Sequence, residues 1–406
     1  MQVGHRLPRN SVIYPVGGAA FGDYDVSKLG PSPVKAPMRA PEPAFERQDA
    51  QFARAFQILQ QAIEQRAFPG AALAVAQGGR LLALRGVGRF TYEDGAPAVT
   101  ADTVFDLASV SKVVATSAMS MLLYDAGQLD LDQPVWNIFP EFAGEDPRRR
   151  DITLRLLLAH SSGLPAYERL FQRARTRDEL LRAALETPLT AEPGTRAEYS
   201  DIGFIILGEA LARIAGETLD RFCQTHVFGP LGMAHTGYCP PAAWKSAIPP
   251  TVDDRDFRHR VVQGEVHDEN ASVMGGVSGH AGVFAPAADV AAFAQAVLDS
   301  RGSQAGGLFR RETVLLFTQR QSTPAKNSRA LGWDTPSQPS QSGRYLCRSS
   351  FGHLGYTGTS LWIDPERELS ITLLTNRTWP DNRNQQIKEV RPRWHDAVVE
   401  ALSCSA

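Results

Sequence analysis

The chain has 406 residues, of which 43% are hydrophobic and 21% are charged, and its formal net charge is -2. This length exceeds the size at which one core stops growing, so two lobes, or one core with an inserted lobe, are expected. The interspersed charges provide no broad basic surface for nucleic acid. A run of about 18 apolar residues, the length that crosses a bilayer, is absent, so an integral membrane protein is excluded.

Metal and disulfide frameworks are not indicated. The nine histidines lack an H-E-x-x-H pattern. The four cysteines are far apart and lack C-x-x-C spacing: Cys223, Cys239, Cys347 and Cys404. We expect no metal and no other cofactor. The amino terminus has no charged region followed by an apolar stretch, so we expect a cytoplasmic location, with the periplasm open if the N-terminus is incomplete. The sequence does not indicate an oligomeric state.

The first ordered elements follow a long arm. Residues 1–45 are rich in Pro and Gly and show no sustained period, so they are predicted to be extended or disordered. Order should begin near Glu46 with a helix whose apolar residues recur at helical spacing: Phe52, Phe56, Leu59 and Ile63. Two strands, 71–76 and 80–87, should then form a hairpin about Gly78-Gly79.

The middle of the chain is predicted to be helical and its end to return to strands. Helices are expected at about 109–125, 154–160, 177–186, 202–214, 288–298 and 391–402, and strands at 360–363 and 370–375. Strands at both ends with helices between them predict one antiparallel sheet built from the two ends. The expected fold class is therefore α/β. We expect an α/β lobe from 46–105 and 275–406, and a mainly helical lobe from 106–274.

The most informative pair is Ser109 and Lys112. Residues three apart on a helix share a face, with β-carbons about 5–6 Å apart, so the hydroxyl and the amine can meet. A serine in the first turn also lies beside free N–H groups that favour negative charge. The alternative is a capping serine and a solvated lysine. Against it, only six of the 42 basic residues are lysines, and lysine, unlike arginine, can lose its proton when desolvated.

Two further segments carry chemical groups. Tyr199-Ser200-Asp201 follows a turn and precedes a helix, which puts a phenol and a carboxylate on a loop, although a helix cap with a packed tyrosine is the alternative. In residues 351–358, the glycines around His353 permit a ligand to approach the backbone closely, although a simple turn is the alternative.

In this order, and with Leu156–Pro165 beside them, the three segments resemble the serine β-lactamase and penicillin-binding protein superfamily, particularly its class C-like esterase and amidase branch. Residues 264–271 and 276–282 are similar to muropeptide-processing members. The resemblance covers about 46–401. It implies a β-lactamase-like sandwich, in which an antiparallel sheet with flanking helices adjoins an all-helical lobe.

The resemblance also implies roles for individual residues. Ser109 corresponds to the nucleophile of an acyl-enzyme mechanism, Lys112 to its amine partner and Tyr199 to the phenol that completes proton transfer. His353-Leu354-Gly355 corresponds to the third motif of the family. The backbone N–H groups of Ser109 and Tyr356 would then form the oxyanion hole.

The choice of base depends on the pKa values of two groups. Lysine and tyrosine have reference pKa values of about 10.4 and 10, so either needs a lowered pKa to act as a base near neutral pH. Many relatives have Asn where this chain has Asp201, and a nearby carboxylate would keep Lys112 protonated. We therefore favour Tyr199 as the base. Asp201, and His353 in place of a permanent cation, point away from efficient β-lactamase action.

The sequence offers two other candidate nucleophile arrangements. His160, His267 and His280 could form a Ser-His-Asp site with Asp268, but the chain has no G-x-S-x-G elbow, and His267-Asp268 is expected instead to line the site or fix a loop. Ser111 is two residues from Ser109 and should point to a different face.

The leading hypothesis is a metal-independent serine hydrolase that forms an acyl-enzyme at Ser109 and cleaves an amide or ester. Its expected partner is a small-molecule or peptide substrate, plausibly derived from peptidoglycan. Two alternatives stay open: a short-chain carboxylesterase, and a non-catalytic penicillin-binding sensor that acylates without turnover.

Overall fold

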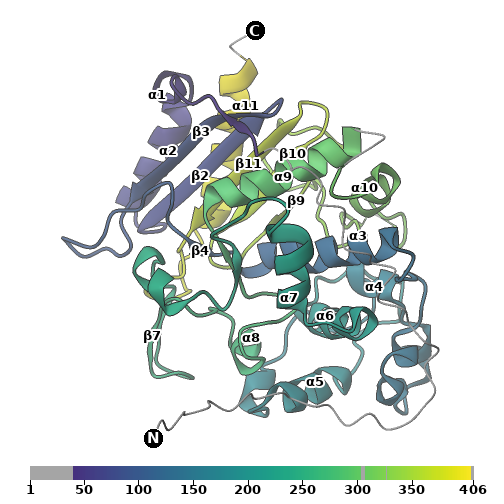
Figure 1. The fold of residues 1–406 in the computed structure, drawn as a ribbon. Helices are drawn as coiled ribbons and strands as arrows, with labels where there is room; N and C mark the ends of the chain where they lie inside the picture. The colour runs from purple at the N-terminus through teal and green to yellow at the C-terminus, as the bar shows by residue number, and fades with distance from the viewer. Residues whose placement is uncertain (1–39, 303–306, 326, 404–406) are drawn as a thin grey trace, which may run out of the picture.

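A six-stranded sheet forms the upper part of the molecule in the computed structural model, which describes residues 40–302, 307–325 and 327–403 (Figure 1). Its strands, in spatial order, are β1 (Glu42–Pro43), β3 (Arg80–Gly88), β2 (Gly70–Gln77), β11 (Leu369–Thr375), β10 (Ser360–Asp364) and β9 (Phe351–Leu354). Neighbours are antiparallel except for the parallel pair β1 and β3. The prediction of a sheet built from both ends of the chain is confirmed.

Helices cover both faces of this sheet. Helices α2 (Ala53–Glu64) and α11 (Ile387–Ser403) pack on one face, against alternate residues of β2 and β11: Ala71, Leu73, Val75, Leu369, Ile371 and Leu373. Helix α9 (Ala287–Gly302) packs on the other face. Because both faces are buried, β2 consists almost entirely of apolar residues.

The remaining elements mostly lie below the sheet in Figure 1. The helices are α1 (Gln48–Gln51), α3 (Ala118–Asp125), α4 (Leu154–Leu158), α5 (Arg177–Leu185), α6 (Asp201–Ala215), α7 (Leu219–Cys223), α8 (Glu269–Val273) and α10 (Arg311–Thr318). A three-stranded sheet contains β4 (Phe105–Asp106), β8 (Val283–Ala285) and β5 (Gly237–Tyr238), and a two-stranded one contains β6 (Val252–Asp254) and β7 (Arg260–Val262).

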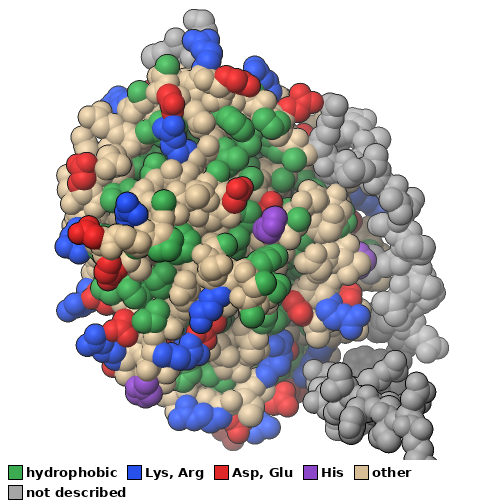
Figure 2. Space-filling view, turned by 60° about the vertical axis from the view of Figure 1, so that its left-hand side comes forward, with side chains coloured by type: hydrophobic (Ala, Val, Ile, Leu, Met, Phe, Trp, Pro, Cys, Tyr) green, Lys and Arg blue, Asp and Glu red, His purple; other side chains and the backbone are tan. Residues whose placement is uncertain are grey.

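The charge of the surface and the length of the helices are relevant to binding of nucleic acids and membranes. On the face drawn in Figure 2, acidic and basic side chains are interspersed, and neither sign covers a broad area. Within residues 40–302, 307–325 and 327–403, no helix has both the length and the apolar character needed to cross a bilayer.

Two sequence predictions need correction at the ends of elements. Glu42 and Pro43 already pair with β3 as strand β1, before the predicted start of order near Glu46. Most of the arm predicted for residues 1–45 lies outside the described residues. The closing helix begins at Ile387 rather than at 391, and Pro392 lies inside it. Ile387 and Val390 are buried in the core beneath the sheet, so tertiary packing extends the helix by one turn at its start.

The segment predicted as one helix over 109–125 is irregular at its start. Residues Ala108–Val110 form a 3₁₀ turn and Lys112–Ser117 a π-helical turn, and regular α-helix begins only at Ala118. Such departures from α geometry inside helices are frequent at functional sites. The predicted helix 154–160 likewise ends at Leu158, because His160 has a φ of 53°.

A close crossing of two glycines joins α6 to the loop before β8. A β-carbon added to Gly208 would lie 2.7 Å from the Cα of Gly279, and one added to Gly279 would lie 2.1 Å from the carbonyl oxygen of Phe204. Neither contact could be accommodated without movement of the backbone. The carbonyl of Gly279 also accepts a hydrogen bond from Thr116 Oγ1 at 2.6 Å.

We expect Gly208→Ala to lower the free energy of unfolding by about 1–3 kcal/mol, the usual cost of inserting a methyl group into a packed interior. Urea denaturation would measure it. Gly302→Ala is the matched control, because a β-carbon at Gly302 meets no atom of the described residues within 4 Å. Equal unfolding free energies for both variants would show that the crossing has room for a side chain.

Candidate active site

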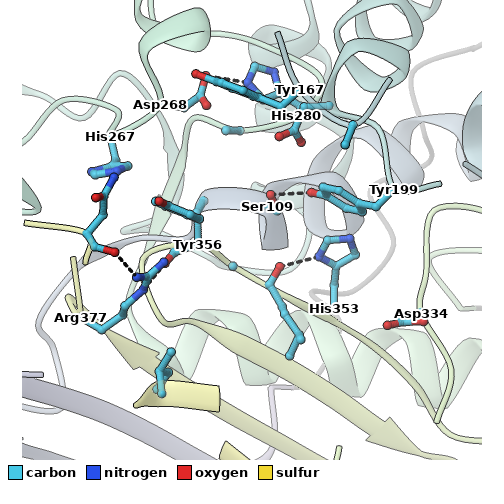
Figure 3. Close-up of a pocket in the computed structure, with 18 of the residues that line it drawn as sticks. Ser109, Tyr167, Tyr199, His267, Asp268, His280, Asp334, His353, Tyr356 and Arg377 are labelled. Carbon is cyan, nitrogen blue, oxygen red and sulfur yellow. Dashed lines mark hydrogen bonds and ion pairs between the residues drawn. The ribbon is translucent and has the colours of Figure 1, made fainter. Parts of the chain in front are cut away.

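Ser109 lies at the base of a cavity of about 620 Å³ (Figure 3). The residue before it, Ala108, has a φ of 47°, a left-handed conformation that is uncommon for any residue except glycine. Its N–H donates to Oδ1 of Asp106 at 2.8 Å, and the other oxygen of that carboxyl accepts from the N–H of His267 at 2.6 Å. Burial raises the pKa of Asp106 to about 6. This carboxyl group therefore fixes the turn that presents Ser109.

Lys112 is fully buried, and its Nζ lies near three oxygens. These are Oγ of Ser109 at 3.1 Å, Oδ1 of Asp201 at 2.7 Å and the carbonyl oxygen of His280 at 2.8 Å. An ammonium group has three N–H donors, so three oxygens satisfy its charged form. Burial lowers the pKa of Lys112, whereas the charge of Asp201 opposes this shift. The contacts favour protonated Lys112.

Tyr199 completes the cluster from the other side. Its hydroxyl lies 2.7 Å from Oγ of Ser109, and its ring lies 4.9 Å from Nζ of Lys112. The loop before α6 holds it in place, because the side chain of the next residue, Ser200, caps that helix by accepting from the N–H of Gly203. The segment therefore contains both a helix cap, at Ser200, and a phenol in contact with the nucleophile, at Tyr199.

The protonation of Tyr199 differs from the expected pattern. Burial, followed by the charge of Asp201, raises the pKa of Tyr199 well above its ordinary value. Protonated Lys112 is expected to lower the pKa of Tyr199. Desolvation of the phenol and the negative charge of Asp201 raise this pKa by more. Tyr199 is therefore a neutral phenol at rest.

The third segment enters the site at the end of β9. His353 is buried, its Nδ1 lies 2.8 Å from the carbonyl oxygen of Leu354, and burial together with Lys112 and Arg329 holds its pKa well below the ordinary value. The ring is therefore neutral at pH 7. A β-carbon on Gly355 would lie 1.9 Å from Thr359 Oγ1, so only glycine fits there.

Tyr356 lies at the edge of the same cavity. It is 49% exposed, and its ring contacts the guanidinium of Arg377, with Cζ 4.4 Å from the ring centre. The backbone N–H of Tyr356 has no hydrogen-bond acceptor among the described residues. Tyr356 and Ser109 both line this cavity.

A Ser278-His280-Asp268 hydrogen-bonded chain is present, but its serine is buried and it does not include Ser109. His280 contacts Asp268 through Nε2 at 2.7 Å, but its Nδ1 faces Oγ of Ser278 at 2.8 Å rather than Ser109. His160 accepts from the N–H of Ser200 beneath Tyr199. Ser111 is fully buried, and its Oγ accepts from the N–H of Val283, so it points away from the cavity as predicted. His267 and Asp268 both line the cavity.

Several residues that the sequence did not single out also line the site. Arg329 lies over the ring of Tyr199, with Cζ 5.3 Å from its centre, and forms a 3.5 Å ion pair with Asp334. Arg391 donates to the carbonyls of Gly355 and Thr359 and fixes the loop of the third segment. No local pattern marks these arginines, because they come from segments that meet the site only in three dimensions.

Comparisons with known proteins agree with this geometry. The family model described as Beta-lactamase matches residues 55–391. The chain is 33% identical over 344 residues to an N-acetylmuramyl-L-alanine amidase of Bacillus subtilis (strain 168), covering 76% of this chain and 77% of that protein.

Two solved structures share the fold. EstCE1, a hydrolase with promiscuous acyltransferase activity, has a TM-score of 0.70 at 22% identity and covers 86% of this chain and 99% of its own. A beta-lactamase from Sulfitobacter sp. EE-36 has a TM-score of 0.69 at 22% identity, with 88% and 99% covered. The two structures show the same fold. The family model and the amidase match identify the chain as a member of the Beta-lactamase family and a serine hydrolase of that family.

Proposed function

We propose that this hydrolase forms an acyl-enzyme at Ser109 and cleaves an amide bond in a peptidoglycan-derived peptide. The observation that carries the proposal is the convergence of Tyr199 Oη and Lys112 Nζ on Oγ of Ser109, at 2.7 and 3.1 Å. The name of the Bacillus relative supports the substrate class.

In the proposed acylation, Tyr199 relays a proton as a neutral phenol. As Oγ of Ser109 attacks the carbonyl carbon, its proton passes to Oη of Tyr199, and the proton already on Oη passes to the leaving nitrogen as the C–N bond breaks. A water molecule then cleaves the acyl ester with the same groups acting in reverse. No standing phenolate is required, which is consistent with the raised pKa of Tyr199.

Lys112 and two backbone N–H groups are proposed to stabilise the negative charge that develops on oxygen atoms during the reaction. Protonated Lys112 stabilises negative charge on the Ser109 and Tyr199 oxygens without giving up a proton. The N–H groups of Ser109 and Tyr356 are proposed as the oxyanion hole, and the absence of a described protein acceptor for the Tyr356 N–H supports this role.

Neutral His353 bears on the choice among substrates. A cation in the third motif would attract the carboxylate of a β-lactam, whereas an uncharged imidazole provides no such attraction. We therefore place amide and ester cleavage ahead of β-lactamase action. The esterase alternative predicts turnover of p-nitrophenyl butyrate without activity on muropeptides, and the sensor alternative predicts a single burst without a steady rate.

Ser109→Ala should abolish covalent labelling by a fluorophosphonate, because no other serine has a phenol and an amine at its oxygen in the described structure. Intact-mass measurement and peptide mapping would test this. Ser111→Ala is the control and should retain labelling. A labelled Ser109→Ala protein would exclude Ser109 as the nucleophile.

Tyr199→Phe should lower kcat by a factor on the order of 10²–10⁴, the usual contribution of a general acid or base. The ring that packs on His160 is retained, so the fold should persist. Steady-state kinetics would measure the effect, and a loss of less than about threefold would transfer the proton-transfer role to Lys112.

Asp201→Asn should move the alkaline limb of the kcat/KM profile to lower pH. Asp201 raises the pKa of Lys112 against the effect of burial, so its removal lowers that pKa further, and the ammonium form is lost at a lower pH. If neutral Lys112 were the base instead, the acidic limb would move to lower pH. The pH profiles of the two proteins therefore distinguish the roles.

A further inference from the structure

The active-site cavity adjoins a second one. This neighbouring cavity has a volume of about 940 Å³, and it shares four lining residues with the first: Arg169, His267, Glu269 and Asn382. A substrate that extends from Ser109 into the second cavity must pass these residues. The charges of Arg169 and Glu269 therefore influence which substrates can bind there.

Glu269, in the first turn of α8, forms no ion pair with another described residue, although the charge of Arg258 lowers its pKa. Its carboxylate accepts from the hydroxyl of Tyr167 at a long 3.5 Å and from its own backbone N–H. The nearby guanidinium of Arg258 is occupied by the carbonyls of Val266 and His267. Arg169, which also lines the junction, forms no ion pair with Glu269 in the described structure.

Charges of both signs act on Glu269. Burial, followed by the charges of Asp268 and Asp254, raises the pKa of Glu269, whereas the charge of Arg258 lowers it. The pKa of the Tyr167 phenol is raised by burial and then by the charges of Asp268, Glu269 and Asp201, and it is lowered by the charge of Arg169. Tyr167 lies above Ser109 at the edge of the cavity in Figure 3 and is 39% exposed. An accessible aromatic ring among carboxylates is suited to a cation.

His267 provides an independent indication of a ligand. Its side chain is buried, Nδ1 has no hydrogen-bond partner in the described structure, and the ring lines both cavities. Burial lowers the pKa of His267 to about 4, so the ring is neutral and carries one lone pair near pH 7. Unpaired buried polar atoms are uncommon in folded proteins, and a bound donor would satisfy this one.

We propose that Glu269 binds a primary ammonium group of the substrate at the junction of the two cavities. The inference rests on the proposed function, because it concerns the substrate of the same site. It assigns the substrate class as peptides that carry a free amino group, and it makes Glu269 a determinant of specificity. An ammonium group there would supply the ion-pair partner that Glu269 lacks among the described residues.

The test compares ligands that differ only in this charge. D-alanine amide and Nα-acetyl-D-lysine amide each carry a free amine, and each has a twin in which that amine is acetylated. Each ligand is titrated against fluorophosphonate labelling of Ser109, and the concentration that halves the labelling rate is compared within a pair. The ratio within a pair is independent of the labelling rate of each variant.

In the wild-type protein, at least one charged ligand should protect Ser109 at a roughly tenfold lower concentration than its acetylated twin, the usual effect of a charged hydrogen bond. Glu269→Gln should reduce that ratio to near one, and Glu269→Asp should retain part of it. Glu265→Gln is the matched control, because Glu265 pairs with Arg260 outside both cavities, and it should behave as the wild type.

Equal protection by both members of each pair in the wild type would overturn the inference while leaving acylation at Ser109 intact. A preference that persists in Glu269→Gln would overturn it as well. Absence of any labelling at Ser109 in the wild type would contradict the proposed function, and the inference with it.

Discussion

The site depends on one buried ammonium group. Lys112 has no exposed surface, and a charge in such a position costs several kcal/mol unless hydrogen bonds and an opposite charge compensate it. Compensation comes from three separate parts of the chain: the Ser109 turn, Asp201 at the start of α6 and the carbonyl of His280. Each of these segments must be in place for the charge to be tolerated. The lysine therefore couples the geometry of the nucleophile to the correct packing of the helical part of the molecule.

Small residues make this convergence sterically feasible. The loop carrying His280 approaches α6 closely because Gly208 and Gly279 face each other, and Thr116, one turn beyond Lys112, holds the Gly279 carbonyl. On the opposite side of Ser109, Gly355 leaves room for Thr359, whose hydroxyl donates to the carbonyl of Leu107 just before the nucleophile turn. The sheet and the helical region thus hold Ser109 between them through contacts that would not tolerate larger side chains.

Electrostatics separates this site from one built for β-lactams. His353 is neutral because it is buried near Lys112 and Arg329, so the third segment carries no charge to attract a carboxylate. The opposite rim carries Asp268 and Glu269, and the phenol of Tyr167 lies in their negative field. Basic residues also line the cavity, among them Arg169, Arg329 and Arg377. The negative field is therefore confined to the rim that carries Asp268 and Glu269, and His353 adds no cation to the opposite side.

The sequence by itself determined the sheet-forming ends, most helices and the identity of Ser109, Lys112 and Tyr199 as chemical groups, because local periodicity and short motifs encode them. The tertiary structure decided the rest. The contact of Tyr199 with Ser109 spans 90 positions and that of Lys112 with His280 spans 168, so no local pattern could fix these distances. Burial set the high pKa of Tyr199 and the neutrality of His353, since desolvation depends on every segment packed around a group. For the same reason, Arg329, Glu269 and Tyr167 became visible as site residues only when the chain was folded.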